Sequence, residues 1–340
     1  MRIDLTVVVP VHDGAAFVAE TLDSVLAQRG VALELVVVDD GSKDATPEVL
    51  ARYADRARVL RQECSGVSAA RNRGAAEARG RVLAFLDQDD VWEPDLAATL
   101  LGALDADAEL VLVHADSWVV DARGRAHGRR GRFLPPARGA AFRTLLARNT
   151  VPIESTLVRR GAFERAGGFD PELRYLEDWD LALRLARAGR FGFVDRPLAR
   201  YRVHARNLSH ALEPMLREEL LLHERVRARC GPLAAGEEAE LARQDARVAL
   251  DLAWQALRRG DRDDARAWRE RAASVRGVAA TDRALLSRRM RVALLGALDA
   301  LDARGLDPIG IADVVRSALP KRRLYGLLPN DLEPGERLEP

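Results

Sequence analysis

The chain has 340 residues, of which 48% are hydrophobic and 31% are charged, a balance typical of a folded globular protein rather than a disordered one. The formal net charge of +1 gives no overall field that would attract nucleic acid, so we expect no nucleic-acid partner. The two cysteines, Cys64 and Cys230, are far apart, which argues against a disulfide framework or a cysteine metal site and favours a reducing compartment.

Short apolar runs alternate with helical patterns in the first part of the chain. The expected strands are residues 5–9, 33–38, 59–60 and 82–86. The expected helices are residues 15–28, 44–54 and 66–78. This order predicts an α/β fold with a doubly wound, mostly parallel sheet.

The pattern changes twice further along the chain. Strands are expected at residues 109–122, 156–158 and 191–204, and helices at 139–148 and 177–188. Residues 123–132 hold five arginines and one histidine among glycines and are expected to form an exposed hairpin or loop. After residue 211 the periodicity is helical, and residues 241–275 indicate a tetratricopeptide-like helical hairpin that turns at Gly260 and Asp261.

Within residues 81–92, an expected apolar strand is followed by three acids, Asp87, Asp89 and Asp90. Open α/β sheets bind their ligands at the carboxyl ends of such strands. Clustered carboxylates repel one another unless a cation neutralises them, so one interpretation is a divalent metal ion held by oxygen ligands and shared with a phosphate. The alternative is a strand followed directly by a helix N-terminus, which favours acids, and Asp90 fits that alternative.

Four other polar groups follow expected strands or open expected helices. In chain order they are His12-Asp13 after Pro10, Asp39-Asp40-Gly41-Ser42, Ser68 to Gly74 with Arg71 and Asn72, and Glu177-Asp178 with Arg202 and His204 downstream. Taken singly, each has an ordinary structural explanation as a turn, a helix cap, a solvated face or a half-buried histidine.

Taken together, the order and spacing of these groups resemble the family 2 glycosyltransferases over residues 3 to about 209. The resemblance implies the A-type nucleotide-sugar fold and an inverting, metal-dependent transfer of one sugar. It implies a UDP-, GDP- or dTDP-linked donor and a hydroxyl on a glycan, lipid-linked or protein acceptor. The chain lacks the Gln-x-x-Arg-Trp sequence of the processive members of the family.

The resemblance also implies roles for individual residues. The nucleotide would contact Pro10, His12, Asp13, Asp39, Asp40, Ser68, Arg71, Asp87 and Arg202. Ser68 would also cap its helix, and Arg202 and His204 would lie on a mobile loop near the diphosphate. His12 and Asp13 depart from the aromatic-Asn pair that the family often carries at this place.

The metal and the base are assigned in the same way. Asp89 would be the main ligand of Mg²⁺ or Mn²⁺, with Asp87 facing the ribose or the metal and His204 as a further ligand. Asp178 would be the general base, with Glu177 as its neighbour and substitute. Partial burial and the adjacent Glu177 are expected to raise the pKa of Asp178, which would make it a stronger base.

The sequence further predicts three regions and a location. Residues 1–210 would form the nucleotide-sugar-binding domain, 211–328 a helical region and 329–340 a loose tail. There is no signal-peptide pattern and no apolar run of about 18 residues, so we expect a cytoplasmic protein. Weak peripheral contact with the cytoplasmic face of a membrane, through basic loops, remains a hypothesis.

Other functions fit the sequence less well. A nucleotidyltransferase of related fold would carry a Gly-rich loop with lysine after the first strand, where this chain has His12 and Asp13. A dehydrogenase would show Gly-x-Gly-x-x-Gly there. The remaining alternative is a non-catalytic scaffold that binds a sugar nucleotide and recruits partners through the helical region.

Overall fold

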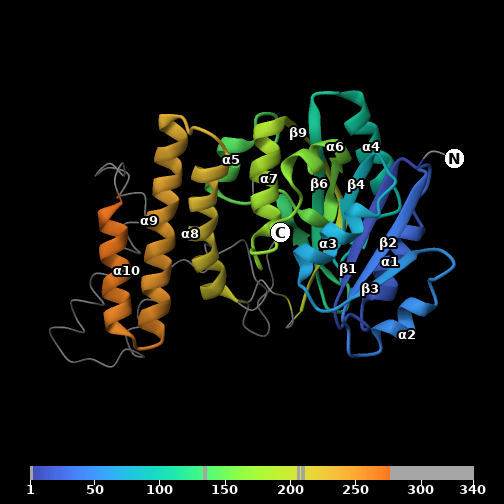
Figure 1. The fold of residues 1–340 in the computed structure, drawn as a ribbon, viewed down its shortest axis with the longest axis horizontal. Coiled ribbons are helices and arrows are strands. Elements are labelled where there is room, and N and C mark those ends of the chain that lie inside the picture. Colours follow the sequence, from blue (N-terminus) through green and yellow to red (C-terminus); the bar gives the residue numbers. More distant parts are fainter. Residues whose placement is uncertain (1–2, 133–135, 205–206, 208–210, 276–340) are drawn as a thin grey trace. The chain divides into compact units, whose positions relative to one another are not determined.

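Figure 1 shows the computed structural model, which describes residues 3–132, 136–204, 207 and 211–275. The chain divides into two compact units, and the division follows Asn207. The first unit contains the sheet and its helices, and the second contains the helices after residue 211. Each unit is described by itself.

Four parallel strands form the first half of the sheet. They are β1 (Leu5–Val11), β2 (Leu33–Asp40), β3 (Arg58–Gln62) and β4 (Val82–Phe85), in the order β3-β2-β1-β4. The connecting helices are α1 (Val18–Leu26), α2 (Thr46–Ala51) and α3 (Val67–Ala76). β1 is central and pairs in parallel with both β2 and β4. The predicted doubly wound α/β fold is therefore confirmed.

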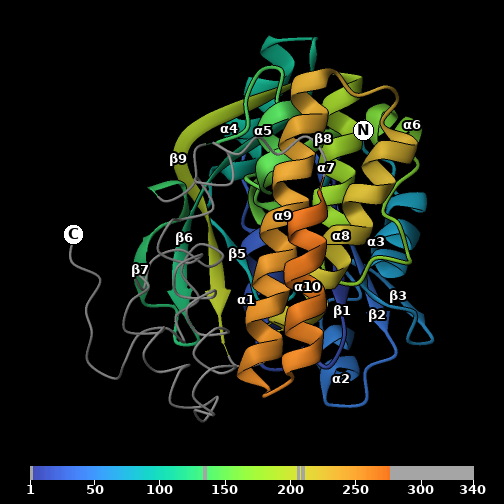
Figure 2. The ribbon, with the colours of Figure 1, turned by 90° about the vertical axis from the view of Figure 1, so that its left-hand side faces the viewer.

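The second half of the sheet mixes parallel and antiparallel pairs. Its strands are β5 (Val91–Trp92), β6 (Leu110–Asp121), β7 (Ala126–Arg129), β8 (Thr156–Arg159) and β9 (Arg190–Val203). The order continues from β4 as β8-β6-β9-β5, with β7 paired to β6. β8 is antiparallel to β4 and β6. β9 runs parallel to β6, and Figure 2 shows these two long strands. The expected exposed hairpin at 123–132 is confirmed, because β6 turns there into β7.

Helices cover both faces of the sheet (Figure 1). The remaining helices of this unit are α4 (Leu96–Ala106), α5 (Phe142–Ala147), α6 (Arg160–Ala166) and α7 (Glu177–Ala188). α1, α2 and α4 pack on one face, where Val37 of β2 joins the main core. Val36 and Val38 point to the other face, under Ala70 of α3. Phe163 of α6 contacts Phe85 of β4 on that second face. Because strand side chains alternate between faces, the wholly apolar strands are buried on both sides.

Two strands run further than the sequence predicts. β1 continues through Pro10, which pairs with Val38 of β2, and the pairing of β1 with β4 ends before this position. Proline lacks an N–H group, so it is tolerated where one neighbouring strand is absent. β2 includes Asp39 and Asp40, which therefore belong to the strand and not to the loop after it.

The second unit contains three helices among the described residues: α8 (Leu212–Arg229), α9 (Ala235–Arg258) and α10 (Arg262–Ser274). α9 and α10 confirm the expected helical hairpin. Gly260 adopts a left-handed φ of +80° at the turn, and Asp261 caps α10 by accepting the N–H of Asp264 at 3.0 Å. Leu216 of α8 and Leu252 of α9 belong to the apolar core of this unit.

Among the helices that the structure describes, none combines the length and the apolar character that a membrane span requires. The expected continuation of the helical region over 276–328 and the expected tail at 329–340 lie outside the described residues.

The close approach of α3 to β1 generates a stability prediction. A Cβ on Gly74 would lie 2.4 Å from Cγ1 of Val8, a branched side chain with little freedom to move. We expect Gly74→Ala to lower the free energy of unfolding by about 1–3 kcal/mol, because the overpacking outweighs the better helix propensity of alanine. Urea denaturation followed by circular dichroism measures the change.

Gly102 in α4 provides the matched control. A Cβ there would meet nothing within 4 Å. Gly102→Ala should therefore raise the free energy of unfolding by about 0.5–1 kcal/mol through helix propensity alone. Equal effects of the two substitutions would contradict the packing of α3 against β1.

Candidate functional site

Arg71 on α3 lies between two acidic side chains from different elements. Its Nη2 donates to Oδ1 of Asp87 at 2.6 Å, and its Nη1 donates to Oε1 of Glu177 at 2.6 Å. Asp87 follows β4, and Glu177 is the first residue of α7. Arg71 is only 2% exposed, and its guanidinium lies 5.2 Å from the ring centroid of Phe169. This arrangement joins the acidic motif after β4 to the Glu-Asp pair, which are far apart in sequence.

Asp178, the expected general base, is the next residue of α7. Its Oδ2 accepts the side-chain amide of Asn149 at 3.1 Å, and its Oδ1 accepts the backbone N–H of Trp179 at 2.6 Å. Burial raises the pKa of Asp178 above its usual value, while the charge of Arg71, the Trp179 N–H and the charge of Arg130 act in the opposite direction. A carboxylate with a raised pKa is a stronger proton acceptor.

Glu177 lies deeper than Asp178. Burial raises the pKa of Glu177 to about 7, with the charge of Arg71 opposing the rise and the charge of Asp178 adding to it. Its Oε2 is buried and has no hydrogen-bond partner among the described residues. Glu177 therefore changes its protonation near neutral pH, inside the contact that holds Arg71.

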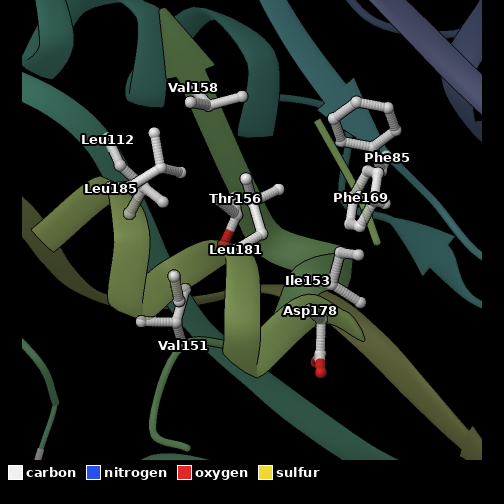
Figure 3. A pocket seen from close by; sticks show the side chains of 11 residues that line it. Phe85, Leu112, Val151, Ile153, Thr156, Val158, Phe169, Asp178, Leu181 and Leu185 are labelled. Carbon is white, nitrogen blue, oxygen red and sulfur yellow. The ribbon is translucent and has the colours of Figure 1, made fainter. Parts of the chain in front are cut away.

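Asp178 borders a small apolar cavity between the sheet and α7. The other lining residues are Phe85, Leu112, Val151, Ile153, Thr156, Val158, Phe169, Leu181, Ala182 and Leu185. The cavity measures about 30 Å³, so it is too small for a sugar and has room for about one water molecule. The carboxylate of Asp178 points away from the apolar side chains (Figure 3). The cavity keeps water from one side of Asp178, in agreement with its raised pKa.

Asp89, the expected main metal ligand, lies against His204. Oδ2 of Asp89 and Nε2 of His204 are 2.8 Å apart, with side chains 16% and 13% exposed. The ring of His204 stacks on Phe17 of the β1–α1 loop at a centroid distance of 4.9 Å. Two of the three expected metal ligands are therefore neighbours, whereas the third, Asp87, faces Arg71.

Arg202 belongs to β9, in agreement with the strand expected at 191–204, and not to the mobile loop that the resemblance implies. Its Nη2 donates to Oε2 of Glu20 at 2.7 Å, and its Nε donates to the carbonyl of Asp89 at 2.9 Å. Its backbone N–H donates to Oδ1 of Asp90 at 2.8 Å. A strand hydrogen-bonded on both sides holds Arg202 in place, and Arg202 in turn fixes the acidic loop.

The interpretation of Asp90 as a helix N-terminal acid is wrong. Asp90 precedes the two-residue strand β5, and α4 begins only at Leu96. Asp90 is 1% exposed, and burial raises its pKa well above the usual range, with the charges of Asp89 and Glu154 adding to the rise. This carboxyl group is therefore a buried part of the acidic loop and is not a cap.

The expected capping role of Ser68 is also wrong. Ser68 is the second residue of α3, and its hydroxyl donates to the carbonyl of Leu173 at 3.3 Å. The groups just before the helix are satisfied by Asp40, whose carboxylate accepts the backbone N–H of Ser65 and of Gly66, each at 2.8 Å. Asp40 is buried at the end of β2 and so anchors the start of α3.

The loops after β1 and β2 are fastened together by carboxylates. Oδ1 of Asp13 accepts the backbone N–H of Lys43 at 2.7 Å and that of Asp44 at 3.3 Å. The Lys43 N–H lowers the pKa of Asp13. Asp39 accepts the backbone N–H of Ser42 at 2.9 Å. Because the carboxylates bind backbone groups, they fix the shape of the loops themselves.

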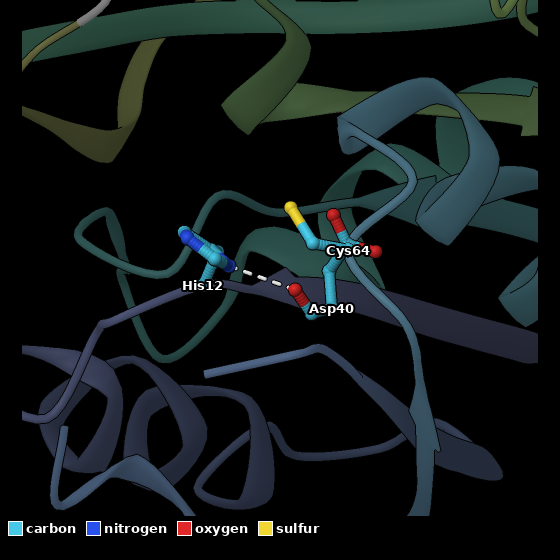
Figure 4. A group of neighbouring side chains, drawn as sticks. All are labelled: His12, Asp40 and Cys64. Carbon is cyan, nitrogen blue, oxygen red and sulfur yellow. Dashed lines mark hydrogen bonds between the residues drawn. The ribbon is translucent and has the colours of Figure 1, made fainter. Parts of the chain in front are cut away.

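His12 connects this region to the acidic loop. Its Nδ1 donates to the backbone carbonyl of Asp40 at 2.7 Å (Figure 4), while Gln88 accepts its backbone N–H at 2.9 Å. His12, Asp40 and Cys64 offer ligand atoms within 4.8 Å of one another, the one such group among the described residues. The hydrogen bond to the Asp40 carbonyl places a proton on Nδ1, and Asp40 already accepts backbone N–H groups, so these atoms serve the loops.

The expected nucleotide-binding residues separate into two sets. Buried in this structure are Pro10, Asp39, Asp40, Ser68, Arg71 and Arg202. His12, Asp13 and Asp87 expose 45%, 42% and 35% of their side chains. The buried set is packed inside the protein, and the exposed set is accessible from solvent.

Several residues at this site were not predicted from the sequence. They are Phe17, Glu20, Gln88, Asn149, Glu154 and Arg130. Gln88 lies inside the Asp87–Asp90 motif and Arg130 inside the arginine-rich stretch, so the sequence could have indicated these two residues. Phe17, Glu20, Asn149 and Glu154 carry no local pattern that marks them.

The family comparison agrees with this geometry. Residues 6–167 match the family model described as glycosyl transferase family 2. The match includes Pro10, the Asp39-Asp40 pair, Arg71 and the acidic motif that ends at Asp90.

Residues 6–167 form a family 2 glycosyltransferase domain. An uncharacterized glycosyltransferase of Rickettsia prowazekii is 28% identical over 222 residues, which are 63% of this chain and 68% of that protein. The succinoglycan biosynthesis protein ExoO of Rhizobium meliloti is 39% identical over 123 residues, 35% of each chain.

Solved structures share the fold of this glycosyltransferase. Residues 1–349 of TarS of S. aureus, in complex with UDP-GlcNAc, align with a TM-score of 0.65 at 16% identity, covering 93% of this chain and 91% of that TarS chain. The mannosyltransferase PcManGT of Pyrobaculum calidifontis, in complex with GDP-Man and Mn²⁺, aligns with a TM-score of 0.58 at 22% identity, covering 94% and 85%.

The protonation of Glu177 generates a prediction for this glycosyltransferase. Between the ordinary pKa of 4.5 and the folded value of about 7, the unfolded chain has released this proton while the folded chain keeps it. Glu177 therefore makes the free energy of unfolding fall as the pH rises through this window, by about 3 kcal/mol. Glu177→Gln should remove that part of the decline, as urea titrations at pH 5 and pH 7.5 would show.

Glu164→Gln is the control, because Glu164 is an exposed acid on α6 that pairs with Arg160. This variant should keep the pH dependence of the parent. If Glu177→Gln also keeps it, then Glu177 is ionised across the whole range and the proposed protonation is refuted.

Proposed function

We propose that this protein transfers a single sugar from a nucleotide-diphospho-sugar to a hydroxyl acceptor, with inversion at the anomeric carbon and dependence on Mg²⁺ or Mn²⁺. One observation carries the proposal. The side chain of Arg71 bonds both to Asp87, at the end of β4, and to Glu177, the first residue of the Glu177-Asp178 pair at the start of α7. Asp87, the candidate group for the metal or the ribose, is thereby held near Asp178, the candidate base. This place is at the carboxyl ends of the strands, where open α/β sheets bind ligands.

The donor would lie along the loops that follow β1 and β4. His12, Asp13 and Asp87 are the exposed members of the nucleotide-binding set, and Gln88 ties their two loops together. A nucleotide-sugar donor is supported by the fold relatives, because TarS is in complex with UDP-GlcNAc and PcManGT with GDP-Man. The similarity to ExoO supports a role in glycan biosynthesis.

The residues near Asp89 fit a divalent cation. Asp89 supplies a carboxylate and His204 a ring nitrogen 2.8 Å away, and Asp87 follows β4 two positions before Asp89. Mg²⁺ and Mn²⁺ sites of this kind use one or two protein carboxylates and leave other positions to phosphate oxygens. When bound, the ion would offset the negative charge that develops on the leaving diphosphate. PcManGT is in complex with Mn²⁺.

Asp178 would act on the acceptor. Asn149 holds one carboxylate oxygen, so the group keeps a fixed direction. Its carboxylate accepts the proton of the acceptor hydroxyl while that oxygen attacks the anomeric carbon and the bond to the nucleoside diphosphate breaks. One displacement from the side opposite the leaving group inverts the anomeric centre. The raised pKa of Asp178 adds driving force to the proton transfer.

The general base is tested by Asp178→Asn in a screen of nucleotide sugars. We expect turnover to fall about 10²–10⁴-fold because the amide cannot accept the proton. The kcat/KM of the parent should decline at low pH with a midpoint above the ordinary aspartate value of about 3.9, because the pKa of Asp178 is raised. Unchanged turnover in Asp178→Asn would refute this choice of base.

The metal ligand is tested by Asp89→Ala with calorimetric titration of UDP, GDP or dTDP in the presence of Mn²⁺. This variant should lose both turnover and metal-dependent nucleotide binding, whereas Asp178→Asn should still bind. Asp55→Asn is the control, because Asp55 is exposed on the loop before β3. Failure of the parent to bind any nucleotide with Mn²⁺ would favour the scaffold alternative.

A further inference from the structure

The hairpin of β6 and β7 delivers one arginine to the candidate base. The one-turn helix after β7 begins with Arg130. Asp116, a buried residue of β6, accepts from Arg129 at 2.7 Å and from the backbone N–H of Gly131 at 2.6 Å. A Cβ on Gly131 would lie 2.9 Å from the Asp116 carboxylate, so glycine permits this approach. One buried acid therefore holds both neighbours of Arg130, through the side chain of Arg129 and the backbone of Gly131.

The side chain of Arg130 is also held, but by one nitrogen. Its Nη1 donates to both carboxylate oxygens of Glu154, at 3.0 and 3.2 Å, and Glu154 is 1% exposed. Its guanidinium lies 5.1 Å from the ring centroid of Tyr201 on β9. Among the described residues, Nε and Nη2 of Arg130 make no hydrogen bond, and the side chain is 30% exposed. One edge of a fixed guanidinium thus remains open.

The partner of Arg130 connects it to Asp178. Glu154 directly follows Ile153, and Ile153 lines the small cavity that Asp178 borders (Figure 3). The positive charge of Arg130 acts on the Asp178 carboxylate, and the Asp178 charge acts on Arg130 in return. Arg71, the other cation that acts on Asp178, is 2% exposed and has both terminal nitrogens engaged with acids. Arg130 is therefore the cation next to the candidate base that has donors to offer to a ligand.

We propose that the open edge of Arg130 binds a carboxylate or phosphate group of the acceptor, next to the hydroxyl that Asp178 deprotonates. The planar fork of arginine matches such oxyanions with two parallel hydrogen bonds. The preferred acceptor is then an anionic glycan, carrying either a uronic acid or a phosphorylated sugar. This inference rests on the proposed function, because it takes Asp178 as the group that faces the acceptor.

Three matched acceptors test the inference: methyl β-glucoside, methyl β-glucuronide and methyl β-glucoside 6-phosphate. With the donor that the nucleotide-sugar screen identifies, the parent should show a kcat/KM about ten- to hundredfold higher for one of the anionic acceptors than for the neutral glucoside. The difference should lie mainly in KM. The glucuronide and the phosphate distinguish the two sources of the anionic group.

The variants separate binding from structure. Replacing Arg130 alone would leave Glu154 buried without a partner, so we use R130K and the double variant R130Q/E154Q. The double variant should reduce the anionic preference to near unity, and R130K should retain part of it because lysine keeps the charge without the fork. R125Q is the control on the same hairpin, because Arg125 is 69% exposed and pairs with Asp121, and it should keep the preference.

Hydrolysis of the donor by water distinguishes the possible failures. R130Q/E154Q should still hydrolyse the donor, because water needs no anionic contact, and its acceptor preference is compared with that of the parent at the pH optimum of each protein. A parent that hydrolyses donor but shows no preference for an anionic acceptor overturns the assignment of Arg130 alone. A double variant that shifts the pH profile and keeps the preference also overturns it, since Arg130 would then act only on Asp178. A parent that hydrolyses no nucleotide sugar overturns the proposed function together with this inference.

Discussion

The contact on which the candidate site depends is the buried bridge from Arg71 to Asp87 and Glu177. It spans three elements, since α3 carries the arginine, the end of β4 one acid and the start of α7 the other. A buried ion pair offers little net stability, but removing one member leaves a charge without a partner and costs about 3–5 kcal/mol. The bridge therefore acts chiefly on geometry: it fixes the acidic loop relative to Asp178.

A second set of carboxylates binds backbone instead of ligand. Asp40 accepts the N–H groups before α3, and Asp13 accepts those of the β2–α2 loop. Hydrogen bonds from backbone N–H groups to a charged acceptor are strong, so these acids hold loops that would otherwise be mobile. The loops at the strand ends therefore contain two kinds of polar residue. Buried acids and arginines define the loops, and the exposed side chains of His12, Asp13 and Asp87 are presented by them.

Desolvation acts unevenly on the acids of this region. Burial raises the pKa of Asp90, Glu177 and Asp178, although arginines lie near all three. Each of these raised pKa values means that the folded environment favours the neutral carboxyl group more than water does. The small apolar cavity beside Asp178 contributes to the raised pKa of this residue, because its apolar lining takes the place of water on one side of the carboxylate.

The sequence by itself determined the α/β alternation, the helical hairpin of α9 and α10, and the positions of the acidic motifs, because period and strand-end chemistry are local properties. The order of the motifs along the chain also predicted that Asp87 and the Glu177-Asp178 pair belong to one site. Only the tertiary structure decided which of these residues are buried inside the protein and which remain accessible to solvent. Arg71, Asp40 and Ser68 carry polar side chains typical of binding, and in the fold they are buried against distant partners such as Glu177, Gly66 and Leu173. Burial is a property of packing between remote segments, and a local pattern of residues does not encode it.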